Sequence, residues 1–228
     1  MIPVDGFDVQ KARDYARGFE IALGVPVVTG VVFDRDYRSD TEIGEIEAGL
    51  REFASLAHIH RRKELENYTL VPAAIASAID RRAAERAQRI GKSIKITENI
   101  DALLESITET MRPMVFGQYL ARRTTRERAQ RPGLDPATIN EAAMIEFDER
   151  WKEMDSRLAM VPGKDVLSLL NQHLQEQYEI SLSALSIVGA MVPGDVADDL
   201  RGLIDALESF RKIRPTGERE EAQGTDRG

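Results

Sequence analysis

The pattern of apolar and polar positions predicts alternating helices and strands over about the first 70 residues. Apolar residues recur at helical spacing over residues 9–23 and again over residues 43–57. The β-branched run at residues 25–33 predicts a strand, and His58-Ile59-His60 predicts a second, shorter strand. Because the first strand is apolar on both faces, we expect it to be covered by helices on each side. Helices and strands that alternate with short connections indicate a doubly wound, parallel sheet.

The rest of the chain has almost only helical patterns. They cover residues 72–90, 97–112, 114–130, 136–157, 163–178, 181–191 and 195–213. Pro113 and three Pro-Gly pairs separate these segments, and we expect each to end a helix. Residues 214–228 are polar and predict a disordered tail. The predicted fold is therefore an α/β portion over residues 1–70 and an all-helical region over 71–213, mostly α in total.

The amino-acid composition excludes several kinds of functional site. The 228 residues carry a net charge of −8 and include no cysteine, which excludes disulfides, thiolate zinc sites and cysteine nucleophiles. A net acidic chain has no overall attraction to nucleic acid, so any such contact has to come from local basic patches. No apolar run approaches the roughly 18 residues of a membrane span, and the N-terminus has no signal-peptide pattern. We therefore expect a cytoplasmic protein without a membrane partner.

Two carboxylates follow the first predicted strand, in the sequence DRDYRSD. If the chain is still extended there, Asp34 and Asp36 point to the same side, at the sheet edge where ligands of open α/β sheets collect. Such a pair suits Mg²⁺ or Mn²⁺, which can activate water and stabilise phosphoryl transfer. The alternative is a salt-bridged turn, since aspartate is common in turns. A haloacid-dehalogenase-like site is disfavoured because Arg38 replaces the small residue it needs, and no nucleotide-sugar feature accompanies a glycosyltransferase DxD.

Three motifs in order carry a family resemblance: DRDYRSD at residues 34–40, ELENY at 64–68 and VPGK at 161–164. Together they resemble the Toprim-type nuclease domain of overcoming-lysogenization-defect (OLD) family proteins. More closely, they are similar to the C-terminal half of bacterial proteins that join an ABC-type ATPase to such a domain. The resemblance extends to about residue 213. It implies a Toprim-like α/β portion and a metal-dependent nuclease that uses Mg²⁺ or Mn²⁺.

The resemblance also implies roles for particular residues. Asp34 and Asp36 match metal ligands, Glu66 matches a further acidic position of the site with Glu64 as the weaker candidate, and Lys164 matches a lysine that contacts the scissile phosphate. Without the resemblance, Glu64 and Glu66 could equally well be surface residues that form ion pairs with nearby arginines. Lys164 stands in the first turn of a predicted helix, where a lysine gains nothing from the helix dipole. That position favours an anionic partner for its side chain.

The chain departs from the family pattern at its start. A Toprim domain begins with a strand that carries a glutamate, and the sequence begins after that point. The resemblance thus implies a truncated Toprim domain whose glutamate and ATPase are supplied in cis or in trans. It also implies a homo-oligomer and a role in bacterial defence against phages or plasmids. The alternative function is a non-catalytic interaction module that pairs with an ATPase or with itself.

Two groups of arginines and one pair of histidines are further candidates. Arg122, Arg123, Arg126 and Arg128, with Arg131 nearby, form a basic face that few acids interrupt, and we expect it to bind nucleic acid, DNA rather than RNA. Arg81, Arg82, Arg86 and Arg89 are expected to form a solvated face instead. His58 and His60 lack a third metal ligand nearby, so a solvated strand face is preferred. Trp151 has helical spacing with Phe147 and is expected in the core.

Overall fold

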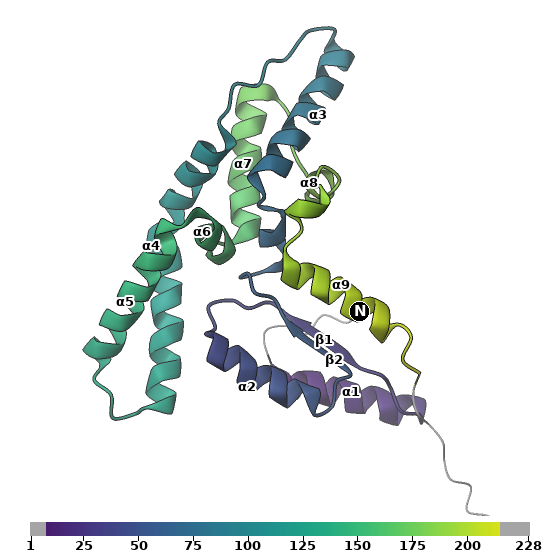
Figure 1. Cartoon of the computed structure of the whole chain (residues 1–228), viewed down its shortest axis with the longest axis vertical. Coiled ribbons are helices and arrows are strands. Elements are labelled where there is room, and N and C mark those ends of the chain that lie inside the picture. The colour runs from purple at the N-terminus through teal and green to yellow at the C-terminus, as the bar shows by residue number, and fades with distance from the viewer. Residues whose placement is uncertain (1–7, 215–228) are drawn as a thin grey trace, which may run out of the picture.

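The computed structural model describes residues 8–214 and confirms a mostly helical protein with a small parallel sheet (Figure 1). The first portion contains α1 (Val9–Leu23), β1 (Gly30–Phe33), α2 (Asp40–Arg51), β2 (Leu56–Ile59) and the 3₁₀ helix η1 (Leu65–Thr69). The helical region contains α3 (Pro72–Ile90), α4 (Ile100–Gln130), α5 (Pro136–Lys152), α6 (Met154–Met160), α7 (Gly163–Tyr178), α8 (Ala184–Val188), η2 (Pro193–Asp195) and α9 (Asp198–Phe210). Within the described range, no helix is long and apolar enough to cross a membrane. The predicted tail lies, except for residue 214, outside the described residues.

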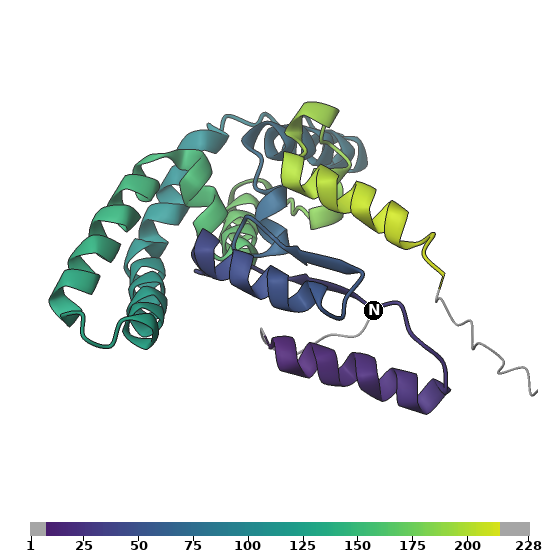
Figure 2. The same ribbon diagram turned by 60° about the horizontal axis from the view of Figure 1, so that its bottom comes forward.

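The sheet consists of β1 and β2, which pair in parallel from Gly30 opposite Leu56 to Phe33 opposite Ile59. Helices α1 and α2 cover one face, where Phe33 and Ile59 join a small hydrophobic cluster. Helix α9 lies across the other face, as the two views in Figures 1 and 2 show. Together these elements hold the carboxyl ends of both strands at the same edge of the sheet.

Helices lie on both sides of the sheet, as expected, but the strand is shorter than the predicted 25–33 and is fully buried on one face only. Only four residues of β1 are in the sheet, because β2 offers only four to pair with them. Burial alternates along β1: Val31 and Phe33 are buried against α1 and α2, whereas Val32 is 39% exposed. The apolar run therefore reflects one buried face and one partly open face, which α9 covers incompletely.

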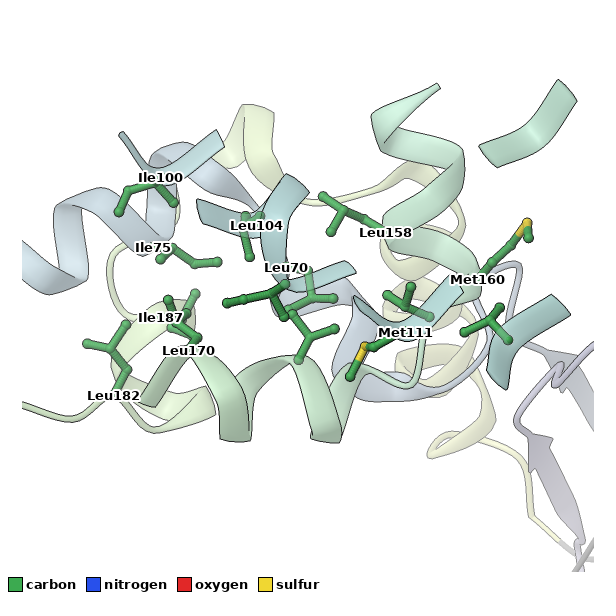
Figure 3. Packing of buried hydrophobic residues seen from close by; sticks show 14 of the residues in the cluster. Leu70, Ile75, Ile100, Leu104, Met111, Leu158, Met160, Leu170, Leu182 and Ile187 are labelled. Carbon is green, nitrogen blue, oxygen red and sulfur yellow. The ribbon is translucent and has the colours of Figure 1, made fainter. Parts of the chain in front are cut away.

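The larger hydrophobic core lies among α3, α4, α6, α7 and α8 (Figure 3). In α3, α4 and α7 the buried apolar side chains recur at helical spacing. The core includes Ile75, Leu104, Leu158, Leu170 and Ile187, all of them almost completely buried. Tyr37 and Leu70, from the first portion of the chain, also belong to this core. Trp151 is buried and stacks on Phe147 with ring centroids 5.2 Å apart, which confirms its predicted place.

Several helix bounds differ from the predicted ones. The pattern over 43–57 ends as a helix at Arg51, and the helices predicted at 97–112 and 195–213 begin at Ile100 and Asp198. Pro113 does not separate two helices but lies inside the continuous helix α4. The proline removes one backbone hydrogen bond, at a typical cost of about 3 kcal/mol. Packing of Phe116 and Tyr119 against Phe147 of the antiparallel helix α5 offsets that cost.

The predicted helix 136–157 is divided at Glu153, whose extended backbone separates α5 from α6. The predicted helix 181–191 shortens to α8.

Candidate functional site

The loop after β1 places the first two candidate residues at the carboxyl end of the sheet. Asp34 follows the strand directly, and one of its carboxylate oxygens accepts a hydrogen bond of 3.2 Å from the backbone N–H of Leu65. Asp36 has φ 50°, in the left-handed region, so the chain turns there instead of continuing as a strand. The argument that alternation places both side chains on one side is therefore wrong. The Asp36 carboxylate pairs instead with Arg38 at 2.8 Å.

The ELENY segment lies beside this loop as helix η1. The backbone N–H of Asp36 donates to the carbonyl of Lys63 at 3.0 Å, which ties the loop to the start of the segment. Asn67 is completely buried, and its side-chain amide donates to the carbonyls of Leu158 and Val161, both at 2.7 Å. Asn67 thus fixes η1 to the turn that precedes α7. The sequence reveals Asn67 only as a polar residue within a motif.

The VPGK turn completes the site from a third part of the chain. Gly163 allows the closest approach, since a Cβ added there would lie 2.8 Å from the backbone nitrogen of Asn67. The backbone N–H of Lys164 donates to the Glu64 carboxylate at 3.0 Å. Its ammonium lies 3.5 Å from the carboxylate of Glu66. Lys164 therefore has the anionic partner that its place at the start of α7 favours.

The close carboxylates affect the titration of Asp34 and of Lys164. The pKa of Asp34 is raised, first by its partial burial and then by the negative charges of Glu64, Asp36 and Glu66, while the Leu65 N–H opposes the shift. The pKa of the Lys164 ammonium is also raised, mainly by Glu66 and Glu64. The structure thus brings together all four residues that the sequence singled out as catalytic. Glu64, the weaker candidate, is an integral member of this acidic cluster, which we define as Asp34, Asp36, Glu64 and Glu66.

A divalent cation would find hard oxygen ligands in the acidic cluster. Within residues 8–214, however, no three His, Cys, Asp or Glu side chains form a group that could hold a metal ion. Mg²⁺ is often held by one or two carboxylates, with water and substrate phosphate as the remaining ligands. The donor chemistry and the raised pKa of Asp34 fit such a site, because a bound cation removes the repulsion between the carboxylates.

The two histidines do not form the solvated face expected of them. His60 is 3% exposed and its ring lies 5.2 Å from that of His58, so they share one side of β2, beneath α9. Burial, and then the neighbouring His58, lower the pKa of His60 to about 4. Tyr68 packs on His60 and donates a hydrogen bond to Asp199 of α9. The histidines therefore belong to the contact between the sheet and α9.

The predicted nucleic-acid-binding arginines on α4 have acidic partners that the sequence pattern could not reveal. Arg122 pairs with Glu42 and Arg126 with Glu45, both on α2, while Arg123 pairs with Glu146 on α5. Arg128 is exposed and has no ion pair with any residue in the described range. Helix α4 is thereby bound to α2 through two of these arginines, and only Arg128 projects without a carboxylate.

The other arginine group agrees with its prediction in part. Arg82 pairs with Glu85 at 2.9 Å, and Arg86 pairs with Glu179 at the end of α7. These contacts confirm the expected pairing of this face of α3 with acidic residues.

Comparison of the chain with protein-family models, with curated proteins and with solved structures found no match. The resemblance to the OLD-family Toprim domain therefore stays a prediction that rests on the three motifs.

Proposed function

We propose that the chain provides a Toprim-like, divalent-cation-dependent nuclease centre that hydrolyses phosphodiester bonds. One observation carries the proposal: the segments 34–36, 64–66 and 163–164, far apart in the sequence, meet at the carboxyl end of β1. Carboxylates and a lysine in contact are the groups that cation-assisted phosphodiester hydrolysis needs. A capped surface turn would account for the positions of Asp34 and Asp36, but not for the contact of Lys164 with Glu66.

Each residue has a role in this centre. One or two of the carboxylates of Asp34, Asp36 and Glu66 would hold Mg²⁺ or Mn²⁺, with water and substrate phosphate as the remaining ligands. When bound, the cation would activate water and neutralise phosphate charge. Lys164, whose side chain is 66% exposed, is free to turn from Glu66 to a non-bridging oxygen of the phosphate. Glu64 positions Lys164 by accepting its backbone N–H. With substrate and cation both bound, Glu66 would face the cation and Lys164 would face the phosphate.

The wider setting follows from the resemblance. The centre would act on DNA in the bacterial cytoplasm, together with an ATPase domain or subunit, in defence against phages or plasmids. The glutamate of the first Toprim strand would come from the same protein or from a partner chain. A homo-oligomer is the expected assembly.

The direct test is cleavage of plasmid DNA with Mn²⁺ or Mg²⁺, by the protein alone and with its ATPase partner. We expect nicked and linear products from the wild type and at least about a hundredfold loss for Asp34→Asn/Asp36→Asn. Asp198→Asn is a matched control, since Asp198 is exposed on α9. Absence of cation-dependent cleavage by the wild type under both conditions overturns the proposal, as does equal activity of the double variant.

A second candidate is the non-catalytic interaction module. It is favoured by the apolar surface of α1, where Phe19, Ile21 and Leu23 are 41%, 74% and 62% exposed. Such a surface suits pairing with an ATPase or with a second copy. Light scattering after size exclusion tests it: Ile21→Glu/Leu23→Glu should convert an oligomer into a monomer. If the wild type is already a monomer, and if the variant binds the ATPase as tightly as the wild type does, this role of α1 is excluded.

A further inference from the structure

A cleft of about 750 Å³ opens next to the acidic cluster, between the loop after β1 and the hairpin of α4 and α5. Its lining includes five arginines: Arg35, Arg38, Arg123, Arg131 and Arg150. Only three carboxylates line it as well, those of Asp40, Glu127 and Glu146. Four of the five arginines have carboxylate partners, in the pairs Arg35–Asp40, Arg38–Asp36, Arg123–Glu146 and Arg131–Glu127. The surplus positive charge of the cleft is therefore that of Arg150, in a protein whose net charge is −8.

Arg150 is the arginine of the cleft that has no carboxylate within ion-pair distance among residues 8–214. Its guanidinium lies 6.0 Å from the ring centroid of Tyr119, which also lines the cleft. Arg131 is exposed and pairs with Glu127 one turn away on the same helix, a contact that contributes little in water. Both arginines can therefore contact a bound anion without breaking a buried ion pair.

Tyr37 also lines the cleft and is only 9% exposed. Its hydroxyl has no hydrogen-bond partner among the described residues, but it is buried from solvent in the larger hydrophobic core and is therefore not a contact for a ligand in the cleft. The start of α2, with Ser39 as its cap, lies in the same wall and adds the positive end of a helix dipole.

We propose that this cleft binds the sugar–phosphate backbone of a DNA strand to one side of the bond held at the acidic cluster. The identity of the ligand rests on the proposed nuclease function. The two sites are continuous, because Arg38 lines the cleft and pairs with Asp36 of the acidic cluster at 2.8 Å. A strand whose scissile phosphate lies beside Lys164 would place its next phosphates among the arginines of the cleft.

The cleft also revises which arginines bind nucleic acid. Of the four predicted from the sequence, Arg123 lines it, whereas Arg122 and Arg126 are held by carboxylates of α2. Arg128 lies outside the lining although it is exposed and lies on the same helix. This difference provides a matched control on α4.

The test is binding of a labelled single-stranded oligonucleotide in EDTA, followed by fluorescence anisotropy over a salt series. We expect Arg131→Gln/Arg150→Gln to bind about tenfold more weakly, with a salt slope smaller by about 1.4 for two lost phosphate contacts. Arg128→Gln should bind as tightly as the wild type does. The variant Arg131→Gln/Arg150→Lys, which keeps a positive charge at residue 150, should bind more tightly than Arg131→Gln/Arg150→Gln. Thermal unfolding checks that each variant is folded.

Three results overturn the proposal: a wild type that does not bind DNA, cleft variants that bind normally, or Arg128→Gln weakening binding as much as the double variant. Because EDTA removes divalent cations, the measurement is independent of cleavage. If the cleft variants lose binding but the wild type never cuts DNA, the nuclease function fails and the binding site stands. If the wild type cuts DNA but the cleft variants bind normally, only the binding site fails.

Discussion

The backbone N–H of Lys164 donates a 3.0 Å hydrogen bond to the carboxylate of Glu64, a hundred residues earlier in the chain. The same lysine places its ammonium 3.5 Å from Glu66. One residue thus binds two members of the acidic cluster, through its backbone and through its side chain. The two contacts separate positioning from chemistry, because substitution at Lys164 removes only the side-chain contact.

Lys164→Ala should therefore reduce plasmid cleavage strongly while leaving the fold intact. The backbone bond to Glu64 survives, and the lost ion pair is solvent-exposed, so the free energy of unfolding should change by less than about 1 kcal/mol. Loss of the charge beside the phosphate should lower the cleavage rate by about a hundredfold. Cleavage assays and urea unfolding of the same preparation measure both. Unchanged cleavage would remove Lys164 from the centre.

Gly163→Ala should destabilise the protein, because the new methyl group meets the backbone of Glu66 and Asn67 and not a flexible side chain. The expected loss in the free energy of unfolding is about 1–3 kcal/mol. Gly202→Ala is the matched control: it lies inside α9 with no atom within 4 Å of the added Cβ, and should stabilise the protein by about 0.5–1 kcal/mol. Urea unfolding compares them; equal effects would contradict the close contact at Gly163.

Asn67→Ala should be among the most damaging single substitutions outside the hydrophobic cores. It leaves two buried carbonyls, those of Leu158 and Val161, without their donor, at about 2–4 kcal/mol in total. Asn140→Ala, which removes one partly buried bond to Thr124, should cost about 1 kcal/mol. The midpoints of thermal unfolding should follow this order.

The buried histidine should make stability depend on pH. Burial, together with the neighbouring His58, lowers the pKa of His60 from 6.5 to about 4, so the unfolded chain takes up a proton at higher pH than the folded protein. Stability is then lost as the pH falls from about 6.5 to 4, by about 3 kcal/mol from this residue. His60→Gln removes this contribution, so its free energy of unfolding should fall less steeply over that interval. Parallel curves for the two proteins would contradict the assignment.

Two tyrosines allow a matched comparison of hydroxyl groups. Tyr37→Phe removes a buried hydroxyl that has no partner among the described residues, and should raise the free energy of unfolding by about 1 kcal/mol. Tyr68→Phe removes a hydroxyl that donates to Asp199 and accepts from the backbone N–H of Arg61 at 3.1 Å, and should lower it by about 1–2 kcal/mol. Chemical denaturation of both variants measures the difference. Effects of the same sign would show that the two environments are alike.

Local patterns predict local structure well in this chain. Helices α3 and α7 have the predicted bounds, because an amphipathic stripe with a proline at or before the first turn specifies a helix almost alone. Pro113 shows the limit of such signals. Its effect inside α4 depends on how well α5 packs against that helix, and the packing involves residues some thirty positions away.

The motifs point to residues that lie close together in the structure, but they do not predict the geometry in which those residues meet. The motifs identify Asp34, Asp36, Glu66 and Lys164, and the structure places them together. The left-handed backbone of Asp36 has no signal in the residues around it. Similarly, the carboxylates that pair with Arg122 and Arg126 come from α2, some eighty residues earlier, so no reading of α4 alone reveals them.

The buried amide of Asn67 has a consequence for how this centre can be dissected or transplanted. The carbonyls that hold it belong to residues 158 and 161, so the geometry of the acidic cluster depends on helices formed much later in the chain. A fragment that ends near residue 70 would retain the carboxylates but lose the anchor that orients ELENY. The acidic cluster with its anchor is therefore discontinuous in sequence. To graft it onto another scaffold, two segments have to be transferred together: the loop after β1 with the 3₁₀ helix η1, and the VPGK turn.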